Sequence, residues 1–142
     1  MIRRFVLVSL ALLCLLATGC GPTPEQRITG KWEGQFSISE SAAAQHSDNP
    51  LLGVVQGMAS TLRLHHEFRA DKTYDADMPT LLGTVKSNGT WQVVANAGDT
   101  ITVRLNPSNG ASFERAVTFI DADHFETTDE NGTLKFTRQP AN

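Results

Sequence analysis

Cysteine is scarce in this sequence: the chain of 142 residues has two, Cys14 and Cys20, and both lie near its beginning. Residues 21–142 therefore cannot form a disulfide. They also lack the nucleophile of a cysteine enzyme and the ligands of a thiolate zinc site or an iron–sulfur cluster. We expect this part of the chain to be held together by packing alone, without a cofactor or a metal ion.

Long apolar runs are missing as well. The run at the beginning follows Arg3 and Arg4, starts at Phe5 and ends at Leu16. It is too short to span a bilayer comfortably, since a spanning helix needs roughly 20 apolar residues. A positive start followed by about a dozen apolar residues is typical of a secretory signal.

Small residues follow this run, and Cys20 comes directly after Gly19. This order resembles the lipobox of bacterial lipoproteins. The resemblance implies removal of residues 1–19, a diacylglyceryl group on Cys20, and a tether over residues 20–27 before a single domain at 28–142. It places that domain on the periplasmic or extracellular side of the outer or cytoplasmic membrane, where more than one acyl chain makes the anchor stable. The alternative is an ordinary secretory signal with a chance cysteine.

Basic charge is also in short supply. The chain has 12 Lys and Arg against 15 Asp and Glu, a formal net charge of −3, and loss of residues 1–19 would leave −5. An acidic domain argues against nucleic acid and against an anionic membrane surface as partners.

Short stretches that alternate polar with apolar residues are abundant, and they are typical of half-buried strands. Turn-forming residues separate them, and one such pair, Asn88-Gly89, is expected to open a strand. The segments expected as strands are 31–38, 61–69, 73–78, 90–95, 100–105, 112–120, 124–128 and 133–138.

Strands joined as hairpins form an antiparallel meander whose two edges must be hidden, and closure into a barrel hides them. We therefore predict an all-β fold, an eight-stranded antiparallel up-and-down barrel with a short helical insertion between the first two strands. Residues 39–60 form this insertion, with an apolar piece that begins near Pro50. It is either a lid or plug over one barrel end or a helix packed outside.

The two ends of the domain resemble lipocalin-like barrels of small bacterial envelope proteins. Gly30 and Trp32 match the Gly-x-Trp of the family's first strand, and Arg138 matches the arginine that covers that tryptophan. "FRADKTY" at 68–74 and "GTWQVV" at 89–94 resemble the rhythm of its middle strands. The resemblance implies a lipocalin-like barrel whose bottom is closed by a guanidinium over an indole, worth about 0.5–2 kcal/mol.

Several inward positions are candidate wall residues of a ligand cup. A small eight-stranded barrel is either filled by its inward side chains or leaves room for one small ligand. His66 falls on an apolar face, where it either fixes a ligand or is a hydrogen-bonded core histidine. The candidate wall residues are Trp91, Tyr74, His66, Phe68 and Met78.

Other candidate motifs favour simpler interpretations. His65 and Glu67 fall on the outer face of their strand. Asp75 with Asp77, and the pair at 121 and 123, have the spacing of hard-cation ligands, but we interpret them as a strand face and a hairpin turn. The sequence has no nucleophile elbow, phosphate loop or dinucleotide fingerprint, so we do not expect an enzyme.

The leading hypothesis is a lipid-anchored envelope protein that binds a small apolar or amphipathic ligand inside its barrel. The alternative is a non-catalytic structural or interaction module, protein-binding or inhibitor-like, with a filled core. A connected cavity of roughly 300 Å³ or more would favour the first, and a packed interior would favour the second.

Overall fold

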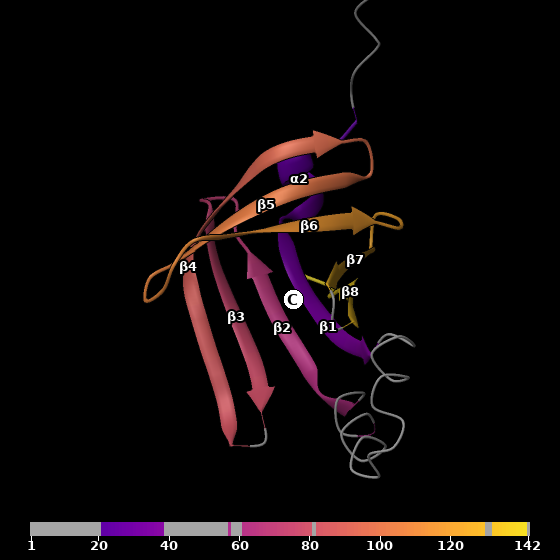
Figure 1. The fold of residues 1–142 in the computed structure, drawn as a ribbon. Coiled ribbons are helices and arrows are strands. Elements are labelled where there is room, and N and C mark those ends of the chain that lie inside the picture. Colours follow the sequence, from indigo (N-terminus) through magenta and orange to yellow (C-terminus); the bar gives the residue numbers. More distant parts are fainter. Residues whose placement is uncertain (1–20, 39–56, 58–60, 81, 130–131, 142) are drawn as a thin grey trace, which may run out of the picture.

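Figure 1 shows the fold in a computed structural model, which describes residues 21–38, 57, 61–80, 82–129 and 132–141. The expected signal at 1–19, Cys20, and the expected insertion at 39–60 apart from Gly57 lie outside the described residues. The elements are α2 (Pro24–Ile28), β1 (Gly30–Ile38), β2 (Arg63–Phe68), β3 (Thr73–Thr80), β4 (Gly83–Ala97), β5 (Thr100–Pro107), β6 (Phe113–Phe119), β7 (His124–Asp129) and β8 (Gly132–Arg138).

The strands close into a barrel in the order β1 to β8, and all neighbours are antiparallel. β8 returns to β1, where the pairing runs from Trp32 opposite Arg138 to Ile38 opposite Gly132. The prediction of an all-β, eight-stranded antiparallel up-and-down barrel is therefore confirmed. Closure pairs both edges of the meander, which removes the exposed edge strands that promote aggregation.

β4 differs most from the sequence expectation. It is 15 residues long, whereas the sequence predicted a strand at 90–95 opened by an Asn88-Gly89 turn. That prediction of a turn is wrong, because the pair lies within the strand, where β4 leaves β3 and continues along β5. A Cβ at Gly89 would collide with the carbonyl oxygen of Asn106 on β5. The glycine therefore permits a close approach of two strands.

The helix α2 packs against one end of the barrel. Thr23 and Gln26 form a capping box, and Pro24 occupies the first turn. The last residues of the expected tether are thus helical, because the cap satisfies the free N–H groups and Ile28 anchors the turn. Ile28 is fully buried, and its carbonyl accepts a hydrogen bond of 2.7 Å from the indole N–H of Trp32.

Arg138 completes this closed end. Its guanidinium lies over the indole of Trp32, 4.1 Å from the ring centroid, which is the contact expected for this pair. It also donates hydrogen bonds to the carbonyls of Arg27 (2.6 Å) and Thr29 (2.7 Å). Gly30, with φ +136°, leaves the necessary space, since a Cβ there would lie 2.6 Å from the guanidinium. One side chain therefore ties the last strand to the segment before the first.

Aromatic side chains fill the barrel above this end. Trp32 meets Phe125 edge-on at 4.6 Å between ring centroids, and Phe125 stacks on Phe136 at 4.6 Å. All three are at least 97% buried. The β3–β4 hairpin extends away from α2 (Figure 1), so the two ends of the barrel differ: one is packed and the other is the candidate mouth.

Candidate functional site

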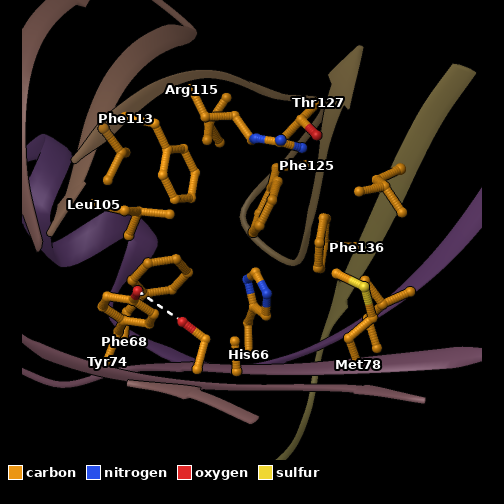
Figure 2. Close-up of a pocket in the computed structure, with 16 residues that line it drawn as sticks. His66, Phe68, Tyr74, Met78, Leu105, Phe113, Arg115, Phe125, Thr127 and Phe136 are labelled. Atoms are coloured by element: carbon orange, nitrogen blue, oxygen red, sulfur yellow. Dashed lines mark hydrogen bonds between the residues drawn. The ribbon is translucent and has the colours of Figure 1, made fainter. Parts of the chain in front are cut away.

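The barrel interior holds a cavity of about 150 Å³. Its wall comes from β2 to β8, which each contribute the residues of one strand face, as the period of two requires. Figure 2 shows these side chains arranged around an empty centre, with Phe125 and Phe136 on one side and Phe68 and Tyr74 on the other. The wall is therefore mostly aromatic and aliphatic.

Typical pockets that enclose drug-sized molecules begin at about 300 Å³. The volume of this cavity is about half of that value. A dry apolar cavity of about this size is nevertheless large enough for a benzene molecule. The interior thus has room for a six-carbon group, or for the end of a longer chain.

Apolar side chains continue beyond the cavity at its rim. Met78 is 48% exposed and Phe113 is 43% exposed, although both line the cavity. Val85 pairs with Met78 across β3 and β4 and is 57% exposed. This surface, which we call the apolar rim (Met78, Val85 and Phe113), extends the contact area available to an elongated molecule.

Four of the five predicted wall residues line the cavity: His66, Phe68, Tyr74 and Met78. Trp91 does not line it. Its ring lies behind Phe68, at 5.6 Å between centroids, and its indole N–H donates to the carbonyl of Arg69. At 1% exposure Trp91 is a core residue, and its backbone N–H donates to the carbonyl of Lys72, which holds it against the β2–β3 turn.

His66 is partly buried between two aromatic rings, with centroid distances of 5.8 Å to Phe68 and 5.3 Å to Phe136. Burial lowers its pKa from 6.5 to about 4, and the positive charge of Arg115 contributes in the same direction. The imidazole is therefore neutral at neutral pH. It can offer one hydrogen-bond donor or acceptor to the interior without adding charge.

Arg115 and Thr127 also line the cavity, and the sequence reasoning missed both. Arg115 alternates with Phe113 and Val117 on the inner face of β6, so the period of two within 112–120 was the available signal. Within the described residues Arg115 has neither a hydrogen bond nor an ion pair. The Thr127 hydroxyl is buried and likewise has no partner among them.

The remaining polar pair in the wall is satisfied. The hydroxyls of Tyr74 and Ser87 are hydrogen bonded at 3.1 Å, from β3 to β4. Figure 2 marks this bond at the edge of the cavity. Neither hydroxyl has a general base beside it in the described structure, so the pair orders the wall without forming a nucleophile–base arrangement.

The charged residues considered earlier lie on the outer wall. His65 is exposed, Asp75 forms an ion pair with Arg69, and Asp77 lies 3.7 Å from Lys86. Asp121 begins a turn, where its carboxylate accepts hydrogen bonds from the Asp123 N–H and the His124 ring, which lower its pKa. Across the described ranges, no three His, Cys, Asp or Glu side chains are placed to hold a metal ion together.

In the described part of the chain, no helix combines the length and apolar character needed to cross a membrane. Comparison with known proteins adds no relative: no family model, no curated protein and no solved structure matches this chain.

Proposed function

We propose that this chain is a lipid-anchored protein of the bacterial cell envelope whose barrel binds a small apolar or amphipathic molecule. The observation that carries the binding role is the cavity of about 150 Å³, with its mostly aromatic and aliphatic wall. The apolar rim supports it by offering further contact area outside. The proposal assigns no catalysis, since the polar groups of the wall lack a nucleophile–base pair among the described residues.

The contact between Arg138 and Trp32 and the closed eight-stranded barrel support the likeness to lipocalin-like barrels. The anchor at Cys20 rests on the sequence alone, on the short apolar run and the small residues before the cysteine. In this proposal the partners are the membrane, through the acyl chains, and the small ligand.

A second candidate is an interaction module with a filled barrel. The volume of the cavity favours it, since 150 Å³ is well below that of typical ligand pockets. In that case the outer wall, with its paired charges, would contact another envelope protein.

Native mass spectrometry distinguishes the two candidates. The protein is extracted gently from the envelope in which it is made, and its mass is compared before and after denaturation. Binding predicts a reproducible additional mass that denaturation removes. A bare protein, which also fails to bind hydrophobic dyes, would favour the filled barrel.

Metabolic labelling with an alkyne-bearing fatty acid tests the anchor. Wild-type protein should take up the label, and Cys20→Ser should abolish it, because the thiol is the acceptor. Cys14→Ser is the matched control and should label normally. Equal labelling of both variants would refute the assignment of Cys20.

A further inference from the structure

The charge of the cavity wall is unbalanced. Two basic residues, His66 and Arg115, line it, and no Asp or Glu is among its lining residues. Arg115 carries a permanent positive charge, because a guanidinium is not deprotonated in proteins. A partly buried guanidinium without a counter-charge among the described residues is costly, and such groups are normally paired. The interior therefore has one net positive charge that nothing in the described wall neutralises.

Thr127 supplies a second, independent observation. Its side chain is 5% exposed, and its buried hydroxyl has no hydrogen-bond partner within the described residues. A valine would fill the same volume without this cost, so the hydroxyl requires an explanation. β6 and β7 are paired neighbours, and Figure 2 shows the guanidinium of Arg115 pointing toward Thr127. A cation and a hydroxyl donor thus lie on the same side of the cavity.

We propose that the ligand is a small apolar carboxylate, bound through its carboxylate by Arg115 and Thr127 and through its hydrocarbon by the aromatic wall. This inference rests on the proposed binding function and specifies the chemical class of the ligand. The planar fork of an arginine matches both oxygens of a carboxylate, and the threonine hydroxyl donates to one of them. An alkylammonium ligand is disfavoured, because it would bring a like charge beside Arg115.

The wall also selects a carboxylate over a phosphate monoester. A phosphate monoester carries close to two negative charges at neutral pH, whereas the cavity offers one permanent cation, since the lowered pKa of His66 keeps it neutral. One negative charge balances Arg115 and leaves no buried excess. The hydrocarbon then lies among Phe68, Phe125 and Phe136, where about six carbons fit, and a longer chain continues over the apolar rim.

Isothermal titration calorimetry at neutral pH with three probes of equal chain length tests this inference. The probes are octanoate, 1-octanol and octylamine, each titrated into the purified full-length protein. Octanoate should bind at least tenfold more tightly than 1-octanol, and octylamine should bind more weakly than either. Arg115→Gln should bring the affinities for octanoate and 1-octanol together, because it removes the charge and keeps most of the volume. Arg104→Gln is the matched control, since Arg104 faces outward beside Glu114, and it should leave the preference unchanged.

Thr127→Val separates a binding role from a structural one. The variant should have a higher melting temperature in the absence of ligand, since an unsatisfied hydroxyl is removed. Its affinity for octanoate should fall about tenfold, because a hydrogen bond to a charged group is lost, while its affinity for 1-octanol stays within twofold. Unchanged affinity for octanoate in this variant would overturn the role of Thr127.

The outcomes also separate this inference from the proposed function. Equal affinity of the wild type for octanoate and 1-octanol would overturn the proposal that the ligand is a carboxylate. It would leave the proposed binding of an apolar ligand in the barrel intact. If none of the three probes binds, the proposed ligand-binding function fails, and this inference fails with it.

Discussion

His66 shows how strongly the barrel changes the chemistry of one residue. The sequence placed it on an apolar face, and the structure adds the reason for its altered pKa: aromatic neighbours and the charge of Arg115. Its neutral form is stable in the interior, whereas the same imidazole in the unfolded chain titrates at its ordinary pKa of 6.5. The difference links the stability of the barrel to pH.

We predict that acid weakens the fold between pH 6.5 and 4 through His66. Over this range the unfolded chain binds a proton that the folded protein does not, so the free energy of unfolding falls as the pH falls. The full effect is roughly 3 kcal/mol from a shift to a pKa of about 4. Urea unfolding at pH 7, 5.5 and 4 measures it, and His66→Leu should flatten the dependence.

His65→Gln is the control for this experiment, because His65 lies on the same strand and is exposed. It should keep the wild-type dependence on pH. Hydrogen bonds lower the pKa values of Asp71 and Asp121. Their contribution to the stability of the folded protein is therefore lost only at still lower pH, below 3.8. A dependence in His66→Leu equal to that of the wild type would contradict the assignment.

Residue types and their alternation were sufficient to predict most of the wall, but they did not show which residues meet across the barrel. Phe68, Tyr74 and Met78 were predicted from the face they share with their neighbours, and they line the cavity. Trp91 has the same periodicity, yet it is core. Arg115 was overlooked because arginine is usually exposed to solvent, although its alternation with Phe113 and Val117 indicated the inner face. How deep a side chain lies inside the barrel depends on the register and tilt of its strand. Both are determined by contacts between neighbouring strands.

Among the elements, β4 shows most clearly where local signals stop being sufficient. Asn-Gly is a strong turn signal, yet Asn88-Gly89 lies inside a strand of 15 residues. Residue 89 must be glycine because the β5 backbone at Asn106 leaves no room for a Cβ. Asn106 is distant in sequence, so a local pattern cannot reveal this contact. Most other turns were predicted correctly, since their residues act within their own hairpins. The turns at 70–72 and 121–123 are examples.

The close approach at Gly89 leads to a prediction at this scale. Gly89→Ala should destabilise the barrel by about 3 kcal/mol, because the methyl group meets backbone atoms that cannot move without breaking the β4–β5 ladder. Gly110→Ala is the control: its Cβ would meet Pro107 at an ordinary 3.7 Å, and we expect a change within about 0.5 kcal/mol. Chemical denaturation of both variants gives the comparison. Equal denaturation midpoints for the two variants would show that the β5 backbone can shift beside residue 89 at little cost in stability.

For the whole molecule, the decisive feature is the seam where the chain closes on itself. β1 and β8 pair along seven positions from Trp32 to Ile38. Arg138 stabilises the closed end, because it stacks on Trp32 and donates hydrogen bonds to the carbonyls of Arg27 and Thr29. A guanidinium performs both tasks at once because it is flat and carries several donors in fixed directions. Lysine retains the charge but has neither property.

Arg138→Lys should therefore lower the free energy of unfolding by about 2 kcal/mol, which corresponds to roughly 8 °C in Tm for a domain of this size. Hydrogen exchange should also become faster at the backbone amides of Arg27 and Thr29 in α2 and its cap, while the β3–β4 hairpin keeps its protection, because the lost contacts hold only the closed end. Arg104→Lys, on the outer wall, should change stability by less than about 0.5 kcal/mol. If the Arg138 variant is as stable as this control, the ladder between β1 and β8 closes the barrel without help from the guanidinium. If exchange rises throughout the barrel, Arg138 supports the whole fold rather than one end.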